Sequence, residues 1–302
     1  MTKWTTDHIP SQHSRRVVVT GTGGLGFEDA LQLAHAGAEV IIAGRNSTKG
    51  EDAVQRIRQS ATGANVRFEM LDLADLTSVA AFGERLKGQV DSLDLLINNA
   101  GVMTPPRRLT TADGFELQLG ANHLGHFALT AALLPLLRKG VSPRMISVSS
   151  VAARQGEIDF DDLNAERSYR PMPVYAQSKL ACLMFALEFE RRSRSGRWGV
   201  AGIAAHPGVA RTQLLYNTPG GHPMRRVRSA LWFLFQPVPQ GALPTLFAAT
   251  SPDAQGGEYY GPDGMAEVRG FPSRAKIPPR ALDEVACSRL WEISEELTGA
   301  RF

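Results

Sequence analysis

The chain has 302 residues, of which 43% are hydrophobic and 21% charged, a balance typical of a soluble globular protein that buries a sizeable core. The formal net charge of +3 and the lack of a basic stripe interleaved with aromatic residues argue against a nucleic-acid partner, and we expect none. No apolar run reaches the ~18–20 residues of a membrane-spanning helix, and the N-terminus lacks the apolar stretch of a signal peptide, so we expect no membrane span.

Short apolar runs alternate with helical segments over the first two-thirds of the chain. Strands are expected at residues 16–21, 38–44, 66–71, 93–98, 144–149 and 199–205. Helices are expected at residues 25–36, 48–59, 76–87 and 114–137, and in a segment that contains Tyr175 and ends near Gly196. Continuous apolar strands that alternate with helices are typical of a parallel sheet covered on both faces. The pattern therefore predicts an α/β fold with a Rossmann-type doubly wound parallel sheet.

The last third of the chain is less regular. Residues 207 to about 240 are rich in Gly, Pro, Arg and aromatic residues, and a helix near 241–250, a short strand near 258–260 and a charged helix near 282–297 follow. We expect one domain over residues 1–302, with a cofactor-binding core at about 14–206 and a substrate lid at about 207–240. The lid is expected to favour a hydrophobic substrate because it carries Leu214, Leu215, Tyr216, Trp232, Phe233 and Phe235.

Tyr175 and Lys179 form a candidate proton-transfer pair. On a helix, residues four apart lie on one face, and a cation close to a phenol favours the phenolate. The spacing is common by chance, so other parts of the chain must support it.

A glycine-rich loop joins the first expected strand to the first helix. Its glycines allow a tight turn and a close approach of backbone to a pyrophosphate, and the following helix N-terminus offers free N–H groups. The spacing Gly-x-Gly-x-x-Gly is met by Gly21, Gly23 and Gly26. The candidate cofactor-binding residues of this loop are Gly21, Thr22, Gly23, Gly24, Leu25 and Gly26.

The second strand ends at Arg45 and Asn46, and no Asp or Glu lies between Val40 and Gly50. A carboxylate here would bind the ribose hydroxyl of NAD, whereas a basic residue suits the 2′-phosphate of NADP. NADP is therefore favoured over NAD. The alternative is that Arg45 is merely an exposed arginine at a strand end.

Further motifs follow at successive strand ends: Asp72-Leu73, Asn98-Asn99-Ala100-Gly101, Ser149-Ser150 and His206-Pro207-Gly208-Val209, with Asn122 on the long helix. With Tyr175 and Lys179, this set resembles the short-chain dehydrogenase/reductase family from about Trp4 to the C-terminus. The long segment at 151–174 and the run at 256–262 resemble its retinol-dehydrogenase-like branch.

The resemblance implies roles for these residues. Tyr175 would be the general acid in carbonyl reduction and the base in alcohol oxidation, with Lys179 beside it. Ser150, rather than Ser149, would bind the substrate oxygen, and Asn122 would anchor a water that relays protons to Lys179. The residues implied to line the cofactor, in addition to Tyr175 and Lys179, are Asp72, Leu73, Asn99, Ala100, Gly101, Pro207, Gly208, Val209 and Thr212. The implied reaction interconverts a small hydrophobic ketone or aldehyde and its alcohol, with NADP(H).

The chain departs from the family in its glycine loop, where Gly21 and Gly24 are separated by two residues instead of three. This departure keeps a second hypothesis open, a nucleotide-binding sensor or partner protein without catalysis. A double-bond reductase or an epimerase on the same fold is a third.

Three further expectations concern metals, cysteines and assembly. His123, His126 and His206 lack a set of carboxylates at ligand spacing, so we predict no metal. Cys182 and Cys287 are far apart in sequence and are expected to be reduced, which favours a cytoplasmic protein. The apolar positions Leu180, Leu183, Met184 and Leu187 fit either a core or a dimer interface, so a homodimer or a homotetramer is left open.

Overall fold

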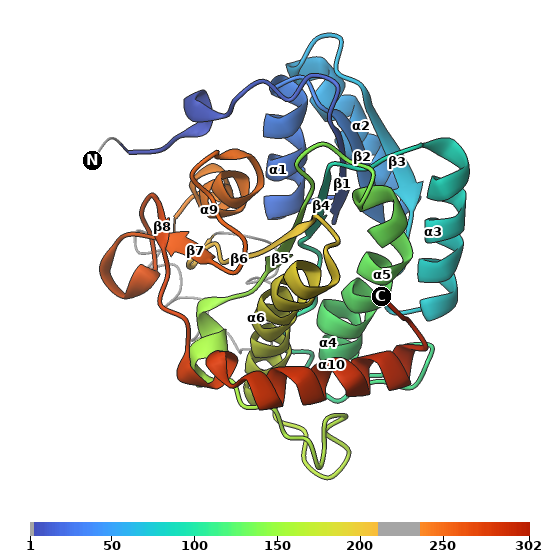
Figure 1. The fold of residues 1–302 in the computed structure, drawn as a ribbon, viewed down its shortest axis with the longest axis vertical. Coiled ribbons are helices and arrows are strands. Elements are labelled where there is room, and N and C mark those ends of the chain that lie inside the picture. Colours follow the sequence, from blue (N-terminus) through green and yellow to red (C-terminus); the bar gives the residue numbers. More distant parts are fainter. Residues whose placement is uncertain (1–2, 211–235) are drawn as a thin grey trace.

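The structure, a computed structural model, describes residues 3–210 and 236–302. Its centre is a twisted sheet with the strand order β3-β2-β1-β4-β5-β6-β7-β8, in which all neighbours are parallel except the last pair (Figure 1). The predicted Rossmann-type α/β fold is confirmed. The strands are β1 (Arg16–Thr20), β2 (Glu39–Gly44), β3 (Val66–Met70), β4 (Leu95–Asn98), β5 (Arg144–Val148), β6 (Ala201–Ala205), β7 (Tyr259–Pro262) and β8 (Pro272–Arg274).

Helices cover both faces of the sheet (Figure 1). On one face lie α1 (Gly24–His35), α2 (Ser47–Ser60) and α9 (Val238–Thr250). On the other lie α3 (Leu76–Gln89), α4 (Leu117–Leu119), α5 (Gly125–Leu137), α6 (Pro171–Gly196) and α10 (Glu284–Thr298). Alternate strand residues supply the two cores, so Val17 and Val19 pack under α1 whereas Val18 faces the α3 side. This alternation explains why each central strand is apolar throughout.

The strands and helices expected from the sequence begin and end within a few residues of the observed ones. The long helix expected at 114–137 is observed from Leu117, where the Glu116 carboxylate accepts the Leu119 N–H, to Leu137, but a π-turn at Gly120–Leu124 that was not expected lies between α4 and α5. Strand β8 was not expected; it pairs antiparallel with β7 at the edge of the sheet.

The apolar positions on α6 lie inside this chain. Leu180, Leu183 and Met184 are each at most 1% exposed, and Leu187 packs against the same core. Of the two interpretations left open for these residues, the structure supports the core. Cys182 and Cys287 are both buried and free, as expected.

The C-terminal helix α10 crosses the outer side of α6 and the α4–α5 layer (Figure 1). Trp291 of α10 is 2% exposed, and its ring lies 4.9 Å from Phe127 and 4.4 Å from Phe302. The Arg192 guanidinium stacks over the same indole at 4.7 Å. An aromatic cluster therefore joins the end of the chain to the helical layer that carries Tyr175.

Within residues 3–210 and 236–302, no helix is both long enough and apolar enough to cross a membrane.

The packing of α10 predicts a large effect at Trp291. Trp291→Ala should lower the free energy of unfolding by about 3–5 kcal/mol, because it leaves a cavity among aromatic rings. Val285 lies on the same helix and is 80% exposed, so Val285→Ala should change the same quantity by less than about 0.5 kcal/mol. Urea denaturation of both variants measures the difference. Equal effects would contradict the packing described for α10.

Candidate active site

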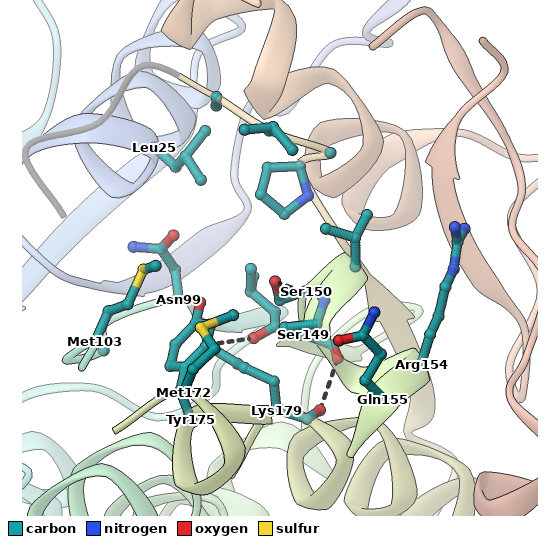
Figure 2. A pocket seen from close by; sticks show the side chains of 18 residues that line it. Leu25, Asn99, Met103, Ser149, Ser150, Arg154, Gln155, Met172, Tyr175 and Lys179 are labelled. Carbon is teal, nitrogen blue, oxygen red and sulfur yellow. Dashed lines mark hydrogen bonds between the residues drawn. The ribbon is translucent and has the colours of Figure 1, made fainter. Parts of the chain in front are cut away.

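Two neighbouring cavities open near the carboxyl ends of the parallel strands, and Gly101 lines both. The first has a volume of about 470 Å³ and is bordered by the end of β5, the start of α6 and the segment after β6 (Figure 2). The second has a volume of about 330 Å³ and is bordered by the ends of β1, β2 and β3. Ligands bind at this edge of open α/β sheets. We call the first the substrate cavity and the second the cofactor cavity, after the ligands that the sequence leads us to expect there.

Tyr175 and Lys179 both line the substrate cavity from α6 (Figure 2). Their side chains are nearly buried, with exposures of 6% and 5%. Lys179 Nζ donates to the Val148 carbonyl at 3.0 Å, which leaves two of its three N–H groups for other partners. Within the described residues the Tyr175 phenol makes no hydrogen bond. The pair therefore keeps hydrogen-bonding capacity that faces a cavity.

The two serines after β5 differ in what their hydroxyls do. Ser149 is 2% exposed, and its Oγ donates to the Lys179 carbonyl at 2.7 Å, which ties β5 to α6. Ser150 Oγ accepts the Ala152 N–H at 3.2 Å, at the start of a 3₁₀ turn, Val151–Gln155. The Ser150 hydroxyl hydrogen thus stays available at the cavity wall. The geometry favours Ser150 as the serine that contacts a ligand.

Asn122 lies in the π-turn and is 1% exposed. Its side chain accepts from the Val102 N–H at 2.8 Å and donates to the Val102 carbonyl at 3.0 Å and to Ser178 Oγ at 2.9 Å. Both amide hydrogens are therefore used, and one lone pair of Oδ1 remains. Asn122 does not line the substrate cavity, and its role as the anchor of a water stays a prediction.

The glycine loop fits a pyrophosphate despite its shorter length. Gly21 and Gly24 have φ of +100° and +55°, the left-handed region that glycine adopts easily, and α1 begins at Gly24 without a side-chain cap. A Cβ at Gly26 would lie 2.5 Å from Asn99 Nδ2, so this glycine lets the loop pack against the end of β4. A Cβ at Gly23 would meet nothing within 4 Å. The uncapped helix start therefore has open space beside it, which suits a phosphate.

Most of the other residues expected to bind the cofactor line one of the two cavities. The cofactor cavity is lined by Gly21, Thr22, Arg45, Asn46, Asp72, Leu73, Ala100 and Gly101. The substrate cavity is lined by Leu25, Asn99, Gly101, Pro207, Gly208 and Val209. Thr212 and the apolar lid residues Leu214, Leu215, Tyr216, Trp232, Phe233 and Phe235 lie outside the described residues.

Lys49 is a cofactor-cavity residue that sequence reasoning missed. It lies in the first turn of α2, where the Asn46 side chain accepts the Lys49 N–H at 2.9 Å. A cation in the first turn of a helix is unfavourable on its own, because the positive end of the helix dipole is there. That feature could have identified Lys49 as a second basic group, beside Arg45, for an anionic ligand.

A network of charged side chains contacts the segment after β6, and no sequence motif predicted it. Glu267 Oε2 accepts from His206 Nε2 at 2.8 Å and pairs with Arg154, which lines the substrate cavity. Burial raises the pKa of Glu267, but its hydrogen bonds to His206 and Lys276 and the Arg154 charge outweigh this and bring it to about 2. Burial lowers the pKa of His206. Arg154, His206 and Glu267 lie more than fifty residues from one another in sequence, so no local pattern predicts their network.

The three histidines considered as metal ligands have other partners. His123 Nε2 is bonded to Ser294 Oγ at 2.8 Å, and His126 Nε2 to Thr20 Oγ at 2.9 Å. Burial lowers the pKa of His123 to about 3 and that of His126 to about 4. The part of the chain that the structure describes contains no group of three or more His, Cys, Asp or Glu residues able to hold a metal ion.

Comparisons with known proteins show the family to which the chain is similar. A family model described as short chain dehydrogenase matches residues 15–220. Human retinol dehydrogenase 13 is 40% identical over 94% of this chain and 85% of its own length. Mouse polyprenol dehydrogenase is 38% identical over 97% of this chain and 86% of its own length. A crystal structure of an uncharacterized protein from Mycobacterium paratuberculosis superposes with a TM-score of 0.83 at 38% identity, covering 100% of this chain and 99% of that one.

The buried imidazoles predict that stability falls in acid. An unfolded histidine has a pKa near 6.5, so between pH 6.5 and about 4 the unfolded chain binds more protons than the folded one. Protonation of His123 and of His126 in the unfolded chain should each lower the free energy of unfolding by about 2 kcal/mol between pH 7 and pH 5. His123→Phe should therefore reduce the loss over this interval by about 2 kcal/mol. Urea denaturation at the two pH values measures it, and an unchanged loss in the variant would contradict the burial of His123.

Proposed function

The chain belongs to the short-chain dehydrogenase family, in its retinol-dehydrogenase-like branch, and we propose that it interconverts a hydrophobic ketone or aldehyde and the corresponding alcohol with NADP(H). Family membership makes the protein an oxidoreductase that uses a nicotinamide cofactor. The proposal adds the cofactor type, the substrate class and the role of Tyr175. The proposal rests mainly on one observation. Ser150, Tyr175 and Lys179 line the same cavity, and this cavity adjoins the cofactor cavity at Gly101.

Each of these three side chains keeps a hydrogen-bonding group to which we assign one step of the reaction. In reduction, the Ser150 hydroxyl donates to the carbonyl oxygen, and the Tyr175 phenol gives that oxygen a proton as negative charge develops on it. Lys179, which lines the same cavity, would stabilise the phenolate that is left, and its free N–H groups would hold the ribose of the cofactor. When bound, the nicotinamide supplies the hydride that reaches the carbonyl carbon. Alcohol oxidation uses the same groups in reverse.

The walls of the substrate cavity support an apolar substrate. Around the polar centre lie Leu25, Met103, Val151, Met172 and Val209. Methionine side chains are flexible and polarizable, so Met103 and Met172 can adapt to substrates of different shape. The relatives' names refer to retinol and polyprenol, which are apolar alcohols.

The preference for NADP rests on the basic groups at the cofactor cavity. Arg45 and Lys49 are both exposed and line this cavity. A 2′-phosphate placed beside them gains charge-assisted hydrogen bonds that the ribose of NAD cannot make.

Tyr175→Phe tests the general acid. The variant should lose at least about 100-fold in kcat for NADPH-dependent reduction of hydrophobic ketones and aldehydes, because no other group in this account supplies the proton. Its Kd for NADPH should change far less than its kcat, because the aromatic ring is kept. Tyr169→Phe is the matched control, since the Tyr169 hydroxyl donates to the Pro105 carbonyl at 2.8 Å and does not line the substrate cavity.

Full activity in Tyr175→Phe would reject the role of Tyr175. Binding of NADPH by the wild type without turnover on any carbonyl would instead favour the non-catalytic sensor, and turnover only on conjugated double bonds would favour a double-bond reductase.

Arg45→Ala tests the cofactor preference separately. Loss of a charge-assisted hydrogen bond should weaken NADPH binding by about tenfold or more and leave NADH binding unchanged. Arg56→Ala removes the same charge from α2, the helix that follows Arg45, at a place outside the cofactor cavity where Arg56 pairs with Asp52 at 3.7 Å, and should change neither Kd. Titration calorimetry with both nucleotides measures the ratio of Kd values. An unchanged ratio in Arg45→Ala would reject the Arg45 role.

A further inference from the structure

His126 connects the cofactor loop to the π-turn that holds Asn122. The imidazole is 3% exposed, and its two nitrogens bond in opposite directions. Nδ1 lies 2.9 Å from the Asn122 carbonyl oxygen, and Nε2 lies 2.9 Å from Thr20 Oγ, at the end of β1 where the glycine loop begins. One side chain therefore spans the two segments.

The bonding partners fix the state of the ring. A carbonyl oxygen only accepts, so Nδ1 carries the hydrogen and donates to Asn122. Thr20 Oγ already accepts the N–H groups of Asn99 at 2.9 Å and Ala100 at 3.0 Å, which uses both of its lone pairs. The Thr20 hydroxyl can then only donate, and its shorter contact is to Nε2, at 2.9 Å, against 3.3 Å to the Ile97 carbonyl, so Nε2 accepts and the ring is neutral. Burial lowers the pKa of His126 to about 4, in agreement with a neutral ring at pH 7.

On the cofactor side, the Thr20 hydroxyl sets the position of the Asn99–Gly101 segment. Besides the two backbone bonds to Thr20 Oγ, Asn99 Nδ2 donates to the Thr20 carbonyl at 2.8 Å. The same amide packs against Gly26 of the glycine loop. Without the bond to His126, Thr20 Oγ is free to move, and with it the backbone of Asn99 and Ala100, which line the two cavities.

On the catalytic side, Asn122 continues the connection to α6. Its Nδ2 donates to Ser178 Oγ at 2.9 Å, and the Ser178 hydroxyl donates to the Tyr175 carbonyl at 2.8 Å. The end of β1 is thus linked to the backbone of Tyr175 through His126, Asn122 and Ser178, by hydrogen bonds to the backbone carbonyl of Asn122 on one side and from its side chain on the other.

We propose that His126 is a positioning residue that fixes the placement of the cofactor loop relative to the Tyr175 helix. It lines neither cavity and acts through Thr20 and Asn122. The inference rests on the proposed function, because the distance it sets is that between a bound nicotinamide and the Tyr175 phenol. A displacement of about 1 Å between reacting groups can cost about 100-fold in rate.

The test compares His126→Phe with His123→Phe. His123 is a neighbouring buried histidine, 2% exposed, that bonds to Ser294 on the α10 side. In His126→Phe the partners keep other bonds, since the Thr20 hydroxyl can donate to the Ile97 carbonyl at 3.3 Å and Cys182 Sγ donates to the Asn122 carbonyl at 3.1 Å. Both variants should therefore fold with reduced unfolding free energy.

Only His126→Phe should change the site. We expect its Kd for NADPH to rise by about tenfold and its kcat to fall by about 10–100-fold, with a smaller change in KM. In the cofactor-free protein, hydrogen exchange at the Asn99 and Ala100 amides should become faster in His126→Phe and stay as in the wild type in His123→Phe. Should His126→Phe not fold, His126→Asn, which keeps a donor near the Nδ1 position and loses the bond to Thr20, should show the same faster exchange.

Equal Kd, kcat and amide exchange in the His126 and His123 variants would overturn the positioning role. Failure of the wild type to bind NADPH or NADH would overturn the proposed function instead. In that case the exchange rates at Asn99 and Ala100 still decide whether His126 holds the loop.

Discussion

Parallel pairing of the central strands is the constraint on which the rest of the structure depends. Val19 pairs with Ile97, and Ile97 pairs with Ile146, so β1, β4 and β5 end at the same edge of the sheet. Each strand is buried on both faces and has no solvent face to carry chemistry. Functional side chains are therefore confined to the residues just beyond the strand ends and to the helices that start there. Both cavities lie at this edge.

Some polar groups near this edge use their hydrogens in bonds within the protein, and others keep hydrogen-bond donors that face a cavity. Ser149 and Asn122 use their hydrogens within the protein, on the Lys179 carbonyl and on Val102 and Ser178 respectively. Ser150, Tyr175 and Lys179 retain donors that face the substrate cavity. A buried polar group is costly unless it is bonded, so unused donors are tolerated only where a cavity or a ligand can satisfy them. This division is the physical reason for assigning chemistry to the second group.

The sequence predicted the sheet and most of the candidate site because both depend on local patterns. Apolar runs located the central strands, and the motifs after them located Ser150, Tyr175 and the glycine loop. The π-turn around Asn122 was not predictable, because one extra residue in a turn leaves the apolar pattern almost unchanged. The Arg154–Glu267–His206 network joins residues far apart in sequence, and only the folded chain brings them together. Lys49 was missed although its place in a first helical turn was visible.

Transfer of a labelled hydride tests the central claim most directly. The purified protein would be incubated with NADPH that carries deuterium on one or the other face of C4, together with a hydrophobic aldehyde, and the alcohol would be analysed by mass spectrometry. We expect one deuterium on the carbinol carbon from one of the two labelled cofactors, and none from the other. Bound NADPH with no deuterium in any product from either cofactor would contradict the proposal that this site reduces a carbonyl group.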